Sequence, residues 1–391
     1  MEDTHSESDL LLPDLFVDNL RGIRKLSISR LGRVTLLAGR NGAGKTSVLD
    51  AVRIFSARGR FNVLGVLLDN REERVILVDD NYEEVAEPDW TALFYGRNIS
   101  EDVQISIGPK NDAEHLTISV TLLTDEQPFL VDRLAPYRML DGRIRALTVR
   151  YKELGYSIPL QIPIDMWEYS DASDNKLVAA LRGPLGFGER TRDQELPPPL
   201  KCFSVGPGML DNFALSAYWT KVALTDGERL VAESLKMMYG EEVERVSVVG
   251  AKSASSKVDG RQAIAKLRNR DRPVPLISLG DGAMRLFGIT LALANCRDGF
   301  LLIDEVENGI HYSVQQDFWR MMLRTAHENN VQVFATTHSW DCVRGFAQAA
   351  VENENVEGVL VRLEKEEDGL RAVRYSERRL KIAAEQRIEV R

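Results

Sequence analysis

Hydrophobic residues gather in short unbroken runs in two parts of the chain. Such runs occur at 33–38 near the start and at 300–305 and 331–338 in the last third. Each has the length and the β-branched or aliphatic content of a buried strand. Apolar positions with helical spacing follow at 46–55 and 313–329. Because buried strands that alternate with helices form parallel sheets covered on both faces, the pattern predicts an α/β fold around a mainly parallel central sheet.

A second pattern, in which apolar and polar residues alternate, occurs in the first 150 residues. Leu15–Val17 and Leu26–Ile28 read as two strands of a hairpin, and 101–107 and 116–122 read as a second hairpin across a turn cluster. A further strand is expected at 146–151. Hairpins of this kind predict an antiparallel N-terminal β lobe beside the central sheet.

The middle of the chain has a different character. Residues 155–272 contain proline-rich and polar loops, a capping box at Thr225–Glu228 that opens a helix, and no heptad run long enough for a coiled coil. We interpret this segment as a lid-like insertion of mixed, mainly helical structure. The predicted division is therefore an N-terminal lobe at 1–154, the insertion at 155–272, and a C-terminal lobe at 273–391.

The most specific motif is Gly39–Thr46, which matches the phosphate-binding pattern G-x-x-x-x-G-K-[ST] at every fixed position. Glycines let backbone N–H groups approach phosphate oxygens, and the following helix adds its partial positive charge. We expect Lys45 to reach the β- and γ-phosphates of ATP and Thr46 to ligate Mg²⁺; the alternative is a glycine-rich turn without a ligand. The predicted nucleotide-binding residues of this loop are Gly39, Arg40, Asn41, Gly42, Ala43, Gly44, Lys45, Thr46 and Ser47.

Polar residues with catalytic chemistry follow the two late strands. Asp304 and Glu305 end one strand, and His338 ends the next. Ligands of parallel sheets sit at the carboxyl ends of the strands, so these groups and the phosphate loop should meet in one crevice. We expect Asp304 to hold Mg²⁺ through water, Glu305 to orient or deprotonate the attacking water, and His338 to sense the γ-phosphate. The alternatives are a solvated strand end for the carboxylates and a structural role for the histidine.

A second phosphate-binding surface is predicted at Ser278–Gly282, directly before the apolar helix Ala283–Ala294. The helix N-terminal amides and the Ser278 hydroxyl suit a phosphate group. Since the chain already has one phosphate loop, this surface makes sense if it closes over the nucleotide of another copy. The alternative is an ordinary turn and helix start. The predicted contact residues here are Ser278, Gly280 and Gly282.

Composition narrows the class of protein. The net charge is −9, with 44% hydrophobic and 28% charged residues, which excludes disorder by composition and disfavours attraction of the whole surface to nucleic acid. The three cysteines, Cys202, Cys296 and Cys342, form no C-x-x-C pair and suit a reducing compartment. The polar start Met1–Asp9 is unlike a signal peptide, and no apolar run reaches membrane-spanning length. We therefore expect a cytoplasmic protein without a membrane partner.

These motifs together carry a family resemblance. Their order resembles that in the ABC-type ATPase heads of the SMC, RecF and OLD-nuclease group, and the opening Asn19–Gly22 looks like theirs too. Within the group, Glu305–His311 looks most like OLD-type ATPases and the AAA-type ATPase subunits of bacterial anti-phage systems. The motifs concerned are Gly39–Thr46, Ser278–Gly282, Ile303–Glu305 and Thr337–Ser339.

The resemblance implies roles for several positions. It implies a signature motif at Ser278–Gly282, a D-loop near Glu307–Gly309, a switch at His338 and nucleotide-driven, head-to-tail dimerisation. The signature departs from the commoner Ser-Gly-Gly-Gln wording, because Leu279 replaces the first glycine and Asp281 replaces the glutamine. No glutamine is clearly placed for a Q-loop.

The resemblance also shapes the expected biological output. OLD nucleases carry a TOPRIM domain after the ATPase, and the segment after Phe346 is too short for one. We therefore expect an ATPase subunit of a bacterial defence module whose ATP state controls a separate, nuclease-like effector. That effector would dock on the insertion or on Arg371–Arg391. The alternative is a DNA-repair or DNA-maintenance head that binds DNA directly through the basic run Lys252–Arg272. Gln104 is the candidate for the Q-loop glutamine.

Overall fold

The computed structural model of the chain describes residues 10–78, 84–100, 102–110, 115–123, 144–152, 154–159, 196–210, 212–252, 259–353, 356–366 and 369–375. Two six-stranded sheets and a smaller three-stranded sheet account for most of the strands in these ranges. None of the helices in the same ranges is both long and apolar enough to cross a membrane.

The central sheet is mainly parallel, as the unbroken hydrophobic runs predict. Its first five strands run parallel to their neighbours, and only the last pair is antiparallel. Three of the four inner strands, β14, β15 and β3, are buried along their whole length, which explains their continuous apolar sequence. The strand order is β10 (Lys201–Val205), β14 (Gly299–Ile303), β15 (Gln332–Thr337), β3 (Val34–Ala38), β16 (Gly358–Glu366) and β17 (Gly369–Tyr375).

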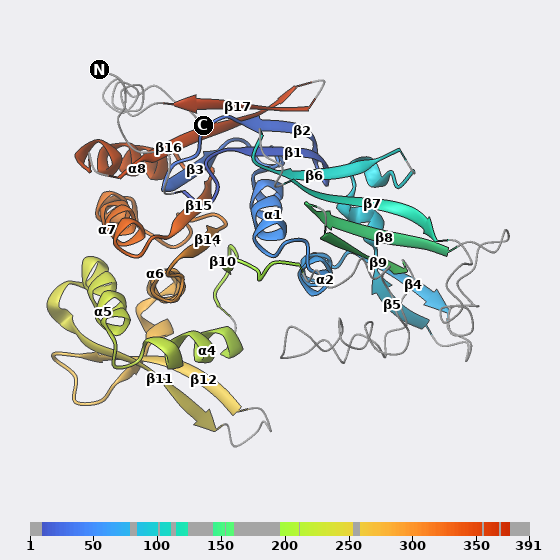
Figure 1. Ribbon diagram of the computed structural model, residues 1–391. Helices are drawn as coiled ribbons and strands as arrows, with labels where there is room; N and C mark the ends of the chain where they lie inside the picture. The colour runs from blue at the N-terminus through green and yellow to red at the C-terminus, as the bar shows by residue number, and fades with distance from the viewer. Residues whose placement is uncertain are drawn as a thin grey trace.

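Helices cover both faces of this sheet (Figure 1). The helix α1 (Lys45–Ser56) lies on one face, and α6 (Asp281–Asn295), α7 (Gln315–Glu328) and α8 (Trp340–Glu352) lie on the other. Successive side chains of β3 point to opposite faces, so Leu37 enters the core around α1 while Leu36 enters the core around the other three helices. The predicted α/β arrangement is therefore confirmed.

The N-terminal β lobe is an antiparallel sheet with the strand order β2-β1-β6-β7-β8-β9. Both predicted hairpins are present, as β1 with β2 and as β6 with β7. The sheet and α1 share one core with the helix α2 (Phe61–Asp69). A separate ribbon of β4 (Arg74–Val78) and β5 (Glu84–Pro88) follows α2. The bounds of the lobe strands are Leu15–Leu20, Ile23–Ile28, Gln104–Gly108, Leu116–Leu123, Ile144–Tyr151 and Leu154–Pro159.

The described part of 155–272 differs from a mainly helical insertion. It contains the helices α4 (Asn212–Val222) and α5 (Asp226–Tyr239), but also β10 and the long ribbon of β11 (Val243–Lys252) and β12 (Asp259–Leu267). β10 pairs with β14 and so forms the edge of the central sheet. Its sequence, KCFSV, is only half-buried and gives no strong hydrophobic signal. Whether the segment acts as a lid, and where its domain boundaries fall, stays a prediction.

The ribbon and the two helices of this segment pack on α6 and thereby hold its first turn. Val231 and Leu235 of α5 share a core with Ala283 and Phe287 of α6. The Thr225 side chain caps α5 as predicted, because it accepts a hydrogen bond from the Gly227 N–H. The capping box is incomplete, since the Glu228 carboxylate accepts from the Leu224 N–H and not from the Thr225 N–H. The short strand β13 (Val274–Pro275) and a 3₁₀ turn at Leu276–Leu279 then lead into α6.

Candidate functional site

The phosphate loop leaves β3 at the carboxyl edge of the sheet and ends at the first turn of α1. Gly39 has a φ of 147°, and a Cβ at this position would lie 2.7 Å from the Leu363 carbonyl oxygen of β16. A side chain therefore cannot be accommodated where the loop leaves the strand. Gly44 precedes α1 with a φ of 81°, in the left-handed region. The glycines of the motif thus meet backbone requirements that the local structure imposes.

Lys45 lies at the start of α1 with its side chain folded onto the loop. Its ammonium donates hydrogen bonds to the carbonyl oxygens of Gly39, at 2.6 Å, and of Arg40, at 3.1 Å. Burial lowers the pKa of Lys45, and the nearby carboxylates, Asp304 first among them, partly offset this effect. A phosphate group near the loop would compete with the two carbonyls for the same ammonium.

Thr46 and Asp304 meet although 258 positions separate them in the sequence. The Thr46 hydroxyl lies 3.1 Å from Asp304 Oδ2. The other carboxylate oxygen, Oδ1, accepts a hydrogen bond from the hydroxyl of Thr336 on β15. A hydroxyl and a carboxylate are hard oxygen ligands of the kind that Mg²⁺ prefers, so the donor set fits the ion. The two residues predicted as metal ligands are therefore neighbours.

Glu305 follows Asp304 in a strained conformation. Its φ of 48° lies in the left-handed region, which is uncommon for a residue other than glycine. The surroundings hold it there: its N–H donates to the Thr336 hydroxyl at 2.8 Å, and its carboxylate accepts a hydrogen bond from the Asn308 amide at 2.8 Å. Such strain concentrates at functional sites, where neighbouring groups over-determine the backbone.

His338 lies at the end of β15 and is anchored by Glu307. Glu307 Oε1 accepts hydrogen bonds from the N–H groups of His338 and Ser339 and lies 3.2 Å from His338 Nδ1. The Glu307 side chain is only 10% exposed, and its second oxygen is buried without a hydrogen-bond partner in the structure. The imidazole itself is 47% exposed, so one side of it stays open. Glu307 thus fixes the position of the predicted switch residue.

The predicted second phosphate surface is formed by a different segment of the chain from the phosphate loop. Ser278 and Gly280 are exposed, and Gly280 has open space where a side chain would be. This turn is bound to α5 by a 2.7 Å hydrogen bond from the Tyr239 hydroxyl to the Leu279 carbonyl. It also packs against the segment after β14. Gly282 is buried, and a Cβ there would lie 2.1 Å from the Gly309 carbonyl oxygen. The structure therefore places Ser278 and Gly280 on an accessible surface and Gly282 in a packing role.

Gln104 does not join this group. It begins β6 in an exposed position, and its side-chain amide lies 3.3 Å from the Ser106 hydroxyl. A Q-loop role for it stays a prediction.

The sequence analysis gave no role to Thr336 or Arg285, and it named Glu307 only as part of the D-loop that the resemblance implies. Thr336 bridges Asp304 and Glu305, and Glu307 holds His338, as described above. Arg285 is a buried arginine in the otherwise apolar helix α6, and its guanidinium donates to the carbonyl oxygens of Asp304 and Glu305. A lone arginine among apolar residues is the signal that could have identified it, because buried charges need specific partners.

A buried charge cluster supports α1 from its other side. Asp50, one turn after Thr46, lies 2.7 Å from Arg71 Nη2 and 3.5 Å from Arg21 Nε. Burial raises the pKa of Asp50, and the two arginines partly oppose this shift. The cluster ties the helix that carries Lys45 and Thr46 to the β1–β2 turn and to the end of α2.

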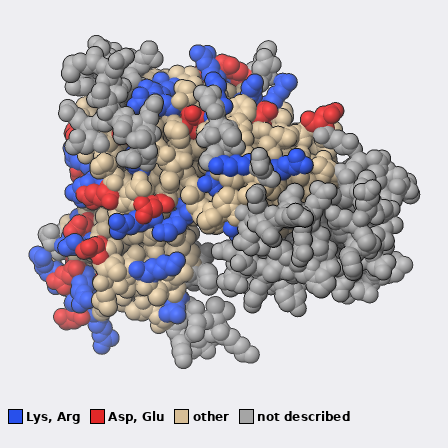
Figure 2. All heavy atoms as spheres, in the orientation of Figure 1, with Lys and Arg blue, Asp and Glu red and all other residues tan. Residues whose placement is uncertain are grey.

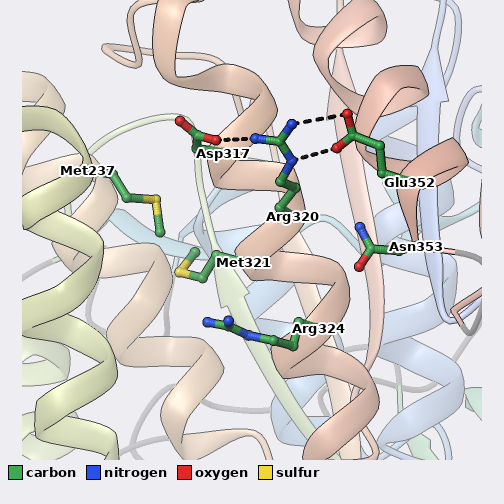
Figure 3. A pocket seen from close by; sticks show the side chains of 7 residues that line it. All are labelled: Met237, Asp317, Arg320, Met321, Arg324, Glu352 and Asn353. Atoms are coloured by element: carbon green, nitrogen blue, oxygen red, sulfur yellow. Dashed lines mark hydrogen bonds and ion pairs between the residues drawn. The ribbon is translucent and has the colours of Figure 1, made fainter.

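A hollow of about 430 Å³ lies on the outer side of α7 (Figure 3). None of the predicted site residues lines it. Arg320 crosses its rim and pairs with Glu352 of α8 and with Asp317. The charged residues of the hollow are exposed, so it resembles an open surface groove more than a built binding site. Its lining residues are Met237, Asp317, Arg320, Met321, Arg324, Glu352 and Asn353.

The basic run is partly neutralised where the structure describes it. Residues 259–272 include β12 and the following turn, and Arg268 lies 3.9 Å from Glu244 on the neighbouring strand. On the face seen in Figure 2, basic and acidic side chains of the described residues are interspersed. The described residues of that face therefore form no broad field of one sign.

Comparisons with known proteins find similarity to an ATPase family over part of the chain. Residues 220–343 match the AAA ATPase domain family. The chain is 32% identical over 92 residues to the uncharacterised protein MJECL11 of Methanocaldococcus jannaschii. The matched residues cover 24% of this chain and 80% of that protein. It is also 32% identical over 92 residues to an ATP/GTP phosphatase of Helicobacter pylori, with 23% of this chain and 25% of that protein covered. The chain thus spans only a quarter of the Helicobacter protein.

Solved structures with a similar arrangement include the Smc head domain from Pyrococcus furiosus with an extended coiled coil, bound to the C-terminal domain of ScpA. The identity is 10%, the TM-score is 0.48, and 96% of this chain and 99% of that chain are covered. At this level the likeness says nothing about function.

Proposed function

We propose that this chain, which belongs to the same family as the Methanocaldococcus protein MJECL11 and contains an AAA ATPase domain, binds ATP with Mg²⁺ and hydrolyses it. One observation carries the proposal: the hydroxyl of Thr46 at the phosphate loop meets the carboxylate of Asp304 at a distance of 3.1 Å. Two sequence-distant oxygen ligands thus meet beside a phosphate loop, as a nucleotide–metal site requires.

Each residue then has a chemical role. Lys45 would leave the loop carbonyls and bind the β- and γ-phosphates, while Thr46 and Asp304 would hold the metal ion. A bound Mg²⁺ supplies charge neutralisation at the phosphate oxygens. Glu305 would accept a proton from the attacking water, which forms a bond to the γ-phosphorus as the bond to the β–γ bridging oxygen breaks. The products are ADP and phosphate.

We also propose that the working form is a head-to-tail pair. The support is that Ser278 and Gly280 are exposed, and that the turn between them is held by α5 through the bond from the Tyr239 hydroxyl to the Leu279 carbonyl. A second copy could place its nucleotide against this surface, at the N-terminus of α6. Each nucleotide would then lie between the phosphate loop of one copy and the surface of the other.

The proposed biological output is a nucleotide-controlled switch for a separate effector, such as a TOPRIM-like nuclease in anti-phage defence. The support is the motif order given above, above all Glu305–His311. The competing proposal is a DNA-maintenance ATPase that binds DNA through the run Lys252–Arg272. DNA binding that falls steeply with salt, and is lost when Lys266, Arg268 and Arg270 become Glu, would favour that alternative. Slow turnover that a co-purifying protein changes would favour the switch.

The central proposal is tested with two variants and two matched controls. Lys45→Ala removes the cation that faces the phosphates, so calorimetry should find a sharp loss of ATP affinity, whereas exposed Lys221→Ala on α4 should bind as the parent does. Glu305→Gln keeps the shape of the side chain and removes its charge, so it should bind ATP yet turn it over far more slowly, whereas exposed Glu328→Gln should keep the parent's rate. Unchanged affinity in Lys45→Ala, or unchanged turnover in Glu305→Gln, would refute the corresponding assignment.

A further inference from the structure

Arg285 is a buried cation whose hydrogen bonds, within the part of the chain that the structure describes, all go to main-chain carbonyl oxygens. The residue is 4% exposed and lies in the second turn of α6. Its Nη1 donates to the carbonyl oxygens of Gly206 and Gly208, the latter at 2.8 Å. Its Nη2 donates to the carbonyl oxygens of Asp304 and Glu305, the latter at 3.1 Å. One guanidinium therefore joins the loop after β10 to the two carboxylate residues after β14.

The two carbonyls bound by Nη2 lie on either side of the strained backbone at Glu305. With a φ of 48°, Glu305 needs its neighbours to fix its conformation. Thr336 holds its N–H, and Arg285 holds its carbonyl and the one before it. Burial lowers the pKa of Arg285, and Asp304, Glu307 and Glu305 counter this effect. These carboxylates therefore offset part of the cost of burying the cation.

The start of α6 touches the far end of the same segment as well. We call residues 304–309 the carboxylate turn. Gly282 packs so closely on Gly309 that a Cβ would lie 2.1 Å from its carbonyl oxygen. Arg285 holds the beginning of the turn and Gly282 packs on its end. α6 begins just after Ser278 and Gly280. A displacement of the helix start would therefore also displace the carboxylate turn, because both Gly282 and Arg285 contact it.

We propose that Arg285 is a positioning residue through which α6 sets the geometry of Asp304 and Glu305. The proposal rests on the ATPase function proposed above. Arg285 binds the turn that carries the carboxylates, and among the described residues none of its hydrogen bonds reaches the phosphate loop. It therefore governs turnover and leaves ATP affinity almost untouched. In a head-to-tail pair, the partner's nucleotide at the start of α6 would act on these carboxylates through the same arginine.

The competing account is that Arg285 only fills space and balances charge. Arg285→Lys separates the two accounts. Lysine keeps the positive charge, but its three donors sit on one nitrogen and cannot span two pairs of carbonyls on different segments, as the planar guanidinium does. If charge and volume are all that matter, lysine restores both stability and turnover. If the bridge matters, lysine restores stability alone.

The first measurement is hydrogen–deuterium exchange without nucleotide, on the parent, Arg285→Lys and Arg285→Met. Peptides from 304–309 should exchange faster in both variants, while peptides from β16 should exchange as in the parent and report that the sheet stays intact. Exposed Arg324→Lys on α7 is the matched control and should change neither peptide. Parent-like exchange at 304–309 in Arg285→Lys would overturn the proposal, whatever the protein does with ATP.

The second measurement is turnover with ATP affinity. Arg285→Lys should bind ATP within about twofold of the parent by calorimetry and turn it over roughly 10- to 100-fold more slowly, as expected for small misplacement of reacting groups. Parent-like turnover in folded Arg285→Lys would overturn the proposal. If the parent and Lys45→Ala bind and hydrolyse ATP equally, the ATPase proposal fails instead, and the exchange result still decides the role of Arg285 in holding the turn.

Discussion

Replacing Thr336 by valine removes a hydroxyl that is hydrogen-bonded to both Asp304 and Glu305. Thr336 is fully buried at the end of β15. Its hydroxyl donates to Asp304 Oδ1 and accepts from the Glu305 N–H at 2.8 Å. Valine has nearly the same shape, so the change deletes two hydrogen bonds and leaves the packing almost as it was. The loss can therefore be assigned to the bonds.

The expected magnitude follows from the two partners. A hydrogen bond to a charged group is worth about 1.5–3 kcal/mol and one to a neutral amide about 0.5–1.5 kcal/mol. Since both partners are partly accessible, Thr336→Val should lower the free energy of unfolding by about 2–4 kcal/mol. Thr35→Val is the control, because Thr35 is equally buried in β3 and its hydroxyl accepts one neutral bond, from the Gly32 N–H at 3.1 Å. That variant should lose about 0.5–1.5 kcal/mol.

Urea unfolding compares the variants through the midpoint and the slope of the transition. Thr336→Val should shift the midpoint more than Thr35→Val at an unchanged slope, and its ATP turnover should fall roughly tenfold or more because both carboxylates lose a fixed partner. Thr336→Ser keeps the hydroxyl, so it should keep turnover while losing stability through the missing methyl group. The reasoning is refuted if Thr336→Val is no less stable than Thr35→Val, or if it turns over ATP at the parent's rate.

Two further predictions concern the second phosphate surface. A chain with Ser278→Arg and a chain with Lys45→Ala should each lack ATPase activity alone but recover part of it when mixed, because a mixed pair contains one intact composite site. No recovery, with mixed pairs demonstrated by cross-linking, would place each site within one chain. Gly282→Ala should destabilise the protein by about 1–3 kcal/mol, since its methyl group would meet the Gly309 carbonyl. A parent-like melting curve for that variant would show that the two segments separate easily.

The local motifs of the site could be predicted because they depend on short stretches of chain. The glycines of 39–46 report the backbone shape that the loop needs, and the β-branched runs at 33–38, 300–305 and 331–338 report burial on both faces of a strand. The meeting of Asp304 with the phosphate loop was also foreseen, because parallel strands end at one edge of a sheet. The roles of these residues in binding and hydrolysis stay predictions.

Other features depend on which strands become neighbours. β10 escaped prediction because an edge strand is half-exposed, and its place beside β14 follows only from the assembled sheet. Thr336 faces Asp304 because β15 lies next to β14, and a buried threonine within a strand carries no sign of this role.

The sequence by itself determined the phosphate loop, the parallel character of the central sheet and the residues that end its strands. Each of these depends on glycine positions or on hydrophobic periodicity, which a short stretch of chain is enough to show. Tertiary structure alone decided that Glu307 holds His338 and that Arg285 reaches from α6 to the carbonyls of Asp304 and Glu305. The physical reason is that the role of a buried polar group depends on the partner that compensates its lost hydration. The packing of helices against the sheet determines which group becomes that partner.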